Sequence, residues 1–210
     1  MSTLALLLSW FLHFDTHLAV FLASYGSLTY GVVFVIVLCE TGLVVTPFLP
    51  GDSLLFAVGA LAGRGLMNVW VLWMLLTLAS ILGDALNYTI GRKIGKAAWN
   101  SRWIRKEHLE RTQLFFQRHG GKAIALSRFM PIIRTMAPFV AGISAMDFRR
   151  FFFYNVIGGI CWVTLFLIGG YFFGTLPFVE KNFSVVILVI IVVSILPGVY
   201  HWVKARMKKS

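Results

Sequence analysis

Long apolar runs separated by short polar breaks organise the chain. Four of them, at 25–45, 66–90, 151–173 and 183–203, have about the 20 residues that an α-helix needs to cross the hydrocarbon core of a membrane. We interpret each run as a transmembrane helix. The predicted fold class is therefore an all-α integral membrane protein, with residues 1–210 forming one membrane domain.

Two further apolar segments, 47–63 and 123–143, contain prolines, which remove backbone donors and clash with the preceding helical turn. Broken backbone at membrane depth persists only where protein or a water-filled cavity satisfies its polar groups. We therefore predict two re-entrant helical hairpins that line an interior cavity. The residues expected to break the helices and line the site are Pro47, Pro50, Gly51, Pro131, Pro138 and Gly142.

The basic residues predict the orientation of the chain. Lysine and arginine total 19 against eight acids, and they gather in a loop at 91–122 and in the tail at 204–210. Short basic loops stay in the cytoplasm, so the C-terminus is expected there. Counting back from the tail, the segment 47–63 enters from outside and the segment 123–143 from inside. Such an inverted pair is typical of a transporter with a midplane binding site.

The remaining segments are expected at the membrane surface. Residues 1–24 carry a polar cluster in their middle, which favours an interfacial helix over a span. Arg105 to His119 is predicted to form a cytoplasmic amphipathic helix that ends at Gly120. The two halves of the domain are then 25–90 and 123–175.

Composition narrows the class of protein. Hydrophobic residues make up 59% of the chain, charged residues only 13%, and the mean hydropathy is +0.82, beyond the usual range of soluble domains. The net charge of +11 comes without a nucleic-acid-binding motif. Neither metal-ligand spacing nor a catalytic triad pattern is evident, so we expect no cofactor, no metal and no enzymatic activity.

Four charged residues in apolar surroundings are the candidate site. Glu40 and Asp52 flank the break in the first half, and Arg128 and Arg134 flank the break in the second. Charges at the bilayer centre are costly and normally pair inside the protein. They could be salt bridges that only pin the hairpins. Arginine, however, fits phosphate with a bidentate fork, and buried carboxylates can exchange protons. We therefore predict a shared site in which the arginines bind phosphate and the acids couple transport to protons.

Two lesser features accompany these charges. Asp84 and Asn87 lie one helical turn apart in the second span, and they either belong to a proton path or serve packing. Three GxxxG spacings, which allow close helix approach, occur at Gly59/Gly63, Gly91/Gly95 and Gly170/Gly174.

The charged and proline-rich motifs resemble those of the DedA family, also called the SNARE-associated Golgi protein family. The matching residues are Glu40, the run Phe48 to Ser53, Arg128, Phe129, Pro131, Arg134, Pro138, Ala141 and Gly142, and the likeness extends through Asp84, Asn87, Asn155, Gly158 and Trp162. The resemblance implies a bacterial inner-membrane protein that supports the cell envelope. It further implies transport driven by the proton motive force, with undecaprenyl phosphate as a substrate. The family's essential acids correspond to Glu40 and Asp52, and its essential arginines to Arg128 and Arg134.

Three functions remain open at this point. The leading one is a flippase that moves a lipid phosphate between leaflets. The second is a proton-coupled antiporter of small cations or other solutes, which needs only the acids. The third is a non-transporting membrane scaffold, which should tolerate neutral substitutions at all four charges. Lipid and protons are the expected partners, nucleic acid is not, and a homo-oligomer remains open.

Overall fold

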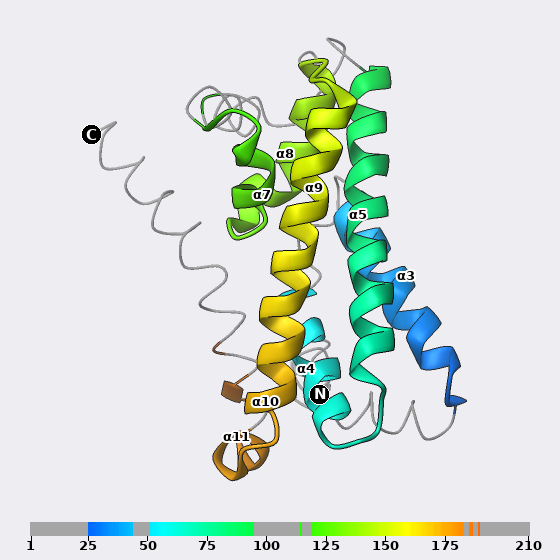
Figure 1. The fold of residues 1–210 in the computed structure, drawn as a ribbon, viewed down its shortest axis with the longest axis vertical. Coiled ribbons are helices and arrows are strands. Elements are labelled where there is room, and N and C mark those ends of the chain that lie inside the picture. The colour runs from blue at the N-terminus through cyan, green and yellow to red at the C-terminus, as the bar shows by residue number, and fades with distance from the viewer. Residues whose placement is uncertain are drawn as a thin grey trace, which may run out of the picture. The chain divides into compact units, whose positions relative to one another are not determined.

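A computed structural model describes residues 25–43, 51–94, 114, 119–182, 185–186 and 189. Within these residues the structure is helical and has no β-strand. The elements in chain order are α3 (Leu28–Gly42), α4 (Gly51–Gly63), α5 (Val69–Ile94), α7 (Lys122–Ser127), α8 (Pro131–Ile143), α9 (Phe148–Val163), the π-helix η2 (Thr164–Ile168), α10 (Gly169–Phe173) and α11 (Pro177–Lys181) (Figure 1).

Two continuous helices are long and apolar enough to cross a membrane. One is α5, and the other runs through α9, η2 and α10 from Phe148 to Phe173; each has 26 residues. These helices confirm the predicted apolar spans at 66–90 and 151–173. The outward side of α5 carries an apolar residue every four positions, as a lipid-facing helix does. These exposed residues are Trp70, Met74, Leu78, Leu82, Leu86 and Ile90.

The chain divides into two compact units. Unit 1 comprises Met1–Val35, Pro50–Leu76 and Val163–Val193, and unit 2 comprises Ile36–Leu49, Thr77–Trp162 and Ser194–Ser210. The helices α3 and α5 each continue from one unit into the other. Most of the candidate site residues belong to unit 2, whereas Asp52 belongs to unit 1.

Unit 1 is built on close packing of α4 against η2 and α10. Nearly all of α4 is buried, from Ser53 through Ala62, as expected for a helix that is apolar on every side. A Cβ atom on Gly59 would lie 2.2 Å from the carbonyl oxygen of Leu167, and one on Gly170 would lie 2.1 Å from that of Phe56. Two of the predicted GxxxG spacings therefore meet in one helix pair.

Unit 2 packs α5 against α8 in the same way. A Cβ atom on Gly91 would lie 2.2 Å from the carbonyl oxygen of Phe139, and one on Gly142 would lie 2.1 Å from that of Tyr88. Beside this contact the ring of Tyr88 stacks on that of Phe151, with centroids 4.4 Å apart. The backbones of α5 and α8 are thus held close enough for their polar side chains to meet.

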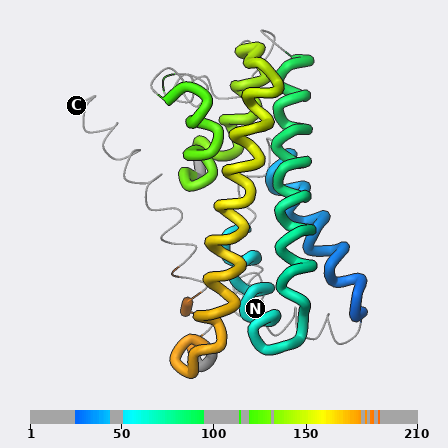
Figure 2. The backbone as a smooth tube through the Cα atoms, in the orientation of Figure 1, coloured from blue at the N-terminus to red at the C-terminus, as the bar shows by residue number. Residues whose placement is uncertain are grey.

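The interruption in the segment 123–143 is narrower than the sequence predicts. Only Arg128, Phe129 and Met130 lie between α7 and α8 (Figure 2), and of these Arg128 keeps helical φ and ψ whereas Met130 is extended. Pro131 is the first residue of α8, where a missing N–H costs nothing.

The predicted break at Pro138 is wrong, because this proline lies inside α8, and Gly142 also belongs to α8 rather than to a break. A proline removes a single helical hydrogen bond, here the one to the carbonyl of residue 134, and packing against neighbours can sustain the helix.

Several predicted features lie outside the described residues: Pro47, Pro50, the helix at 1–24, most of 105–119, the span at 183–203 and the tail at 204–210. Gly51 is described and begins α4, which has 13 residues. Gly120 has a positive φ of 56°, the conformation of a helix-ending glycine. The re-entrant course of the two hairpins stays a prediction.

Candidate functional site

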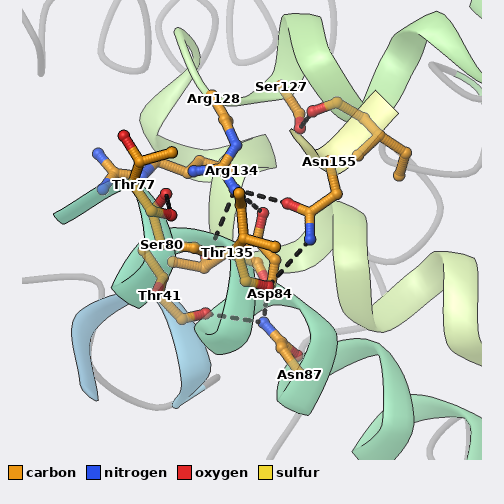
Figure 3. A network of polar contacts seen from close by, with 12 residues as sticks. Thr41, Thr77, Ser80, Asp84, Asn87, Ser127, Arg128, Arg134, Thr135 and Asn155 are labelled. Carbon is orange, nitrogen blue, oxygen red and sulfur yellow. Dashed lines mark hydrogen bonds and ion pairs between the residues drawn. The ribbon is translucent and has the colours of Figure 1, made fainter. Parts of the chain in front are cut away.

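Four charged side chains, of which Glu40, Asp84 and Arg128 are buried and Arg134 is partly buried, form two ion pairs inside unit 2. Nη2 of Arg134, in α8, lies 3.2 Å from Oε1 of Glu40, in α3. Nη2 of Arg128, in the link between α7 and α8, lies 2.6 Å from Oδ2 of Asp84, in α5. Two positive and two negative charges balance, which is how proteins accommodate charge away from water. Figure 3 shows Arg128, Arg134 and Asp84 within one polar network.

The two glycines at the centre of α9 make room for Arg128. A Cβ atom on Gly158 would lie 2.9 Å from Cα of Ala125, 3.0 Å from Cδ of Arg128 and 3.2 Å from its Nε. On Gly159 it would lie 3.0 Å from Oγ of Ser80. Because neither glycine has a side chain, the arginine can reach Asp84 alongside α9.

Every hydrogen bond that the Arg128 guanidinium makes with the described residues falls on the same nitrogen. Nη2 donates to Oδ2 of Asp84 and Oδ1 of Asn155, both at 2.6 Å, and to the carbonyl of Ser80 at 3.3 Å. The amide of Asn155 in turn donates to the carbonyl of Ile81 at 3.0 Å, which fixes its orientation.

The other two nitrogens of Arg128 are buried donors without an acceptor in the part of the chain that the structure describes. These are Nε and Nη1, which carry three of the five N–H groups of an arginine. The residue as a whole is 3% exposed. An unsatisfied buried donor costs about 1–3 kcal/mol, so an incoming acceptor would be favoured here.

Arg134 packs on an aromatic face. Its Cζ atom lies 4.1 Å from the ring centroid of Trp162, which is fully buried in α9. A guanidinium at this distance is attracted by the ring quadrupole. Trp162 therefore holds Arg134 beside Glu40 and leaves the positive charge of the arginine in place.

Asn87 joins three elements rather than contacting an arginine. Its amide nitrogen donates to the carbonyl of Thr135 in α8 at 2.9 Å and to that of Thr41 in α3 at 3.4 Å. Its Oδ1 is buried and has no hydrogen-bond partner among the described residues. Asn87 thus fixes α5 relative to the two elements that supply Glu40 and Arg134.

The structure changes the expected pairing of acids and arginines. Sequence reasoning grouped Glu40 and Asp52 with Arg128 and Arg134. Glu40 does pair with Arg134, but the acid beside Arg128 is Asp84. Asp52 lies in the first turn of α4, in unit 1. For Asp84 the sequence left a proton path or a packing role open, and predicted no pairing with an arginine.

Sequence reasoning gave no role to Asn155, Trp162, Ser80 or Gly158. A buried asparagine inside an apolar span was the available signal for Asn155. Only the family resemblance distinguishes Trp162 from the six other tryptophans, and it gave this residue no role. Within the described residues no cluster of metal-ligating side chains is present.

Comparisons with known proteins agree with this architecture. Residues 49–172 match the model of the VTT domain. The chain is 51% identical to Protein DedA of Escherichia coli K12, over 98% of this chain and 96% of the relative. No solved structure matches.

Two further relatives are named as membrane proteins. The uncharacterized membrane protein Rv0364 of Mycobacterium tuberculosis H37Rv is 39% identical over 83% of this chain and 78% of its own length. Inner membrane protein YghB of Escherichia coli K12 is 37% identical, with 74% and 73% covered. The extent of these matches shows that the chain belongs to the DedA family of VTT-domain membrane proteins.

Proposed function

We propose that this protein is a lipid-phosphate transporter of the bacterial inner membrane, which moves undecaprenyl phosphate between leaflets and couples that movement to the proton motive force. The observation that carries the proposal is the buried Arg128, whose Nε and Nη1 have no acceptor among the described residues. A phosphate group supplies several anionic oxygens and takes arginine in a bidentate mode. Transport of this kind would support maintenance of the cell envelope.

The charge balance of the site supports coupling to protons. Glu40 and Asp84 compensate Arg134 and Arg128 in the structure. A phosphate that enters adds negative charge to a buried region, where an uncompensated charge costs several kcal/mol. Protonation of a carboxylate removes this excess. Asp52 remains, through the family resemblance, a further proposed acid of the transport cycle.

The lipid part of the substrate would stay in the membrane. The apolar outer side of α5 fits a protein surrounded by hydrocarbon. A headgroup would cross through the buried polar site while the polyprenyl chain follows outside. The two oppositely oriented hairpins, the midplane site and the cytoplasmic C-terminus are parts of this proposal.

Binding of a short prenyl phosphate tests the proposal. We expect the purified protein to bind farnesyl phosphate, but not farnesol, which has the same chain without the phosphate. Arg128→Gln should abolish this binding, and Arg128→Lys should weaken it, because lysine keeps the charge but loses the planar fork. Arg149→Gln is the matched control, since Arg149 is exposed on α9. Equal binding by the wild type and Arg128→Gln would contradict the proposal.

A proton-coupled antiporter of small cations is the second candidate. The buried Oδ1 of Asn87, which has no hydrogen-bond partner among the described residues, favours it, because an amide oxygen can coordinate a cation. An antiporter needs the acids but not the phosphate-binding arginines. Cation-driven proton flux that survives in Arg128→Gln and disappears in Glu40→Gln would support this candidate.

A non-transporting scaffold is distinguished by its tolerance of neutral substitutions. Glu40→Gln and Arg134→Gln would then leave the function of the protein in cells unchanged. The lipid-phosphate proposal requires both variants to fail.

A further inference from the structure

The acid that pairs with Arg128 lies in a regular membrane helix rather than at a helix break. Asp84 lies just past the middle of α5, and its side chain is 5% exposed. We propose that Asp84 is a proton-carrying residue of the transport site: its carboxylate holds Arg128 while the site is empty, and it takes up a proton when a phosphate group replaces it. This inference rests on the proposed function.

The geometry of arginine favours this replacement. A guanidinium offers two bidentate edges, one formed by Nε with Nη2 and the other by Nη1 with Nη2. Both edges include Nη2, the nitrogen that Asp84 holds at 2.6 Å. Among the described residues neither Nε nor Nη1 has a bound acceptor, but a phosphate becomes bidentate only when it takes an N–H of Nη2 from the acceptors there, of which Asp84 is the charged one.

Among the described residues, the surroundings of Asp84 offer an ionised carboxylate no second ion-pair partner of its own. Arg128 faces it from the α7–α8 link, and the nearby Arg134 of α8 is already paired with Glu40 of α3. From α9 the neutral amide of Asn155 accepts from the same nitrogen of Arg128. On α5, the helix of Asp84, the basic residues are Arg92 and Lys93, in the last turn. Once a phosphate binds Arg128, the carboxylate of Asp84 would be a buried negative charge beside the negative charge of the phosphate.

Protonation resolves this conflict and leaves the hydrogen bonds satisfied. Burial and a neighbouring negative charge both favour the neutral acid. Asp84 and Asn155 accept from the same nitrogen of Arg128, so their oxygens are neighbours. The new O–H of Asp84 can donate to Oδ1 of Asn155, because an amide oxygen has two lone pairs. The proton comes from water, and no covalent bond to phosphorus changes. When Asp84 releases the proton, its carboxylate pairs with Arg128 again.

The site then has two arginine–carboxylate pairs of the same kind. Glu40 forms an ion pair with Arg134, as Asp84 does with Arg128. Each pair can exchange one carboxylate charge for one proton when its arginine binds a phosphate oxygen. Asp84 therefore adds one proton per bound phosphate to whatever the other acids contribute.

Proton counting on binding tests this role. Calorimetric titration of the purified protein with farnesyl phosphate, repeated in buffers of different ionisation enthalpy, gives the protons taken up per ligand. We expect Asp84→Asn to take up one proton fewer than the wild type. Asp147→Asn is the control, because Asp147 is exposed and its Oδ1 accepts from the N–H of Arg150, which asparagine can also do. An unchanged count in Asp84→Asn would overturn the role of Asp84 but not phosphate binding.

A second measurement keeps Asp84 intact, in case its substitution prevents folding. The triple variant Asp15→Asn, Asp52→Glu, Asp147→Asn leaves Asp84 as the sole aspartate and retains a carboxylate at position 52. After labelling with ¹³C-aspartate, infrared difference spectra should show a protonated-aspartate band when farnesyl phosphate binds. Binding without that band overturns the inference. Failure of the wild type to bind farnesyl phosphate would overturn the proposed function, and this inference with it.

Discussion

Trp162 lies under the guanidinium of Arg134, with the ring centroid 4.1 Å from Cζ. Arg134 is thereby held between an aromatic face and the carboxylate of Glu40, 3.2 Å from its Nη2. The two contacts restrain the arginine in different ways. The attraction of Glu40 depends on a charge that protonation would remove, whereas the attraction of the ring involves no titratable group.

We expect Trp162→Leu to weaken binding of farnesyl phosphate about 2- to 30-fold, and Trp162→Phe to have a smaller effect. Cation–π contacts contribute about 0.5–2 kcal/mol, with tryptophan the strongest ring and leucine offering no π face. Titration calorimetry measures the change. Trp70→Leu, on the exposed side of α5, is the control and should bind as the wild type does. Equal dissociation constants for Trp162→Leu and the wild type would show that the ring does not position Arg134.

Gly158→Ala should displace Arg128 and lower the affinity for farnesyl phosphate roughly tenfold or more. Its Cβ would lie 2.9 Å from Cα of Ala125 and 3.0 Å from Cδ of Arg128, and such overpacking costs about 1–3 kcal/mol. Gly169→Ala, further along the same continuous helix, is a matched control because no atom lies within 4 Å of its Cβ. Normal affinity in Gly158→Ala would mean that α9 does not confine the arginine.

Gly59→Ala should reduce thermal stability through unit 1, because its Cβ would lie 2.2 Å from the backbone oxygen of Leu167. Backbone atoms must shift to relieve this contact, at a cost of about 1–3 kcal/mol. Thermal unfolding in detergent provides the measurement, and Gly31→Ala, with open space around its Cβ, should not be destabilised. If both variants unfold at the same temperature, the glycine contact between α4 and η2 is not tight.

Ala145→Gly should stabilise the protein by about 1 kcal/mol. Ala145 has a φ of 51° in the turn that ends α8, a left-handed conformation that costs a residue with a Cβ about 1–2 kcal/mol. The turn is fixed by hydrogen bonds from the N–H of Ala145 to the carbonyl of Gly142 and from that of Met146 to Ala141, the pattern that favours glycine at this position. A lower unfolding temperature for Ala145→Gly would contradict this reading of the turn.

Three members of the site could be predicted from the sequence because they are conspicuous. Glu40, Arg128 and Arg134 are charges within apolar stretches, and such groups are costly unless they pair. The structure places all three in one network of unit 2. The all-helical class and the two long apolar helices followed from run length and composition in the same way.

The pairing of Arg128 could not be predicted, because it depends on how helices are rotated and packed. Asp52 drew attention through its place next to two prolines, whereas Asp84 sits in an uninterrupted helix whose inward face the sequence does not mark. Asp84 lies beside Arg128 because α5 packs closely on α8 at Gly91 and Gly142. This packing exists only in the folded protein. Similarly, the GxxxG spacings gave no indication that Gly59 and Gly170 belong to one helix pair.

Translocation of undecaprenyl phosphate by proteoliposomes tests the account most directly. Vesicles that contain wild-type protein, Arg128→Gln or Arg149→Gln are loaded with the lipid, and the fraction accessible from outside is followed under an imposed proton gradient. The account predicts gradient-dependent translocation by the wild type and Arg149→Gln, and none above the rate of empty vesicles for Arg128→Gln. Translocation by Arg128→Gln at the wild-type rate would contradict it.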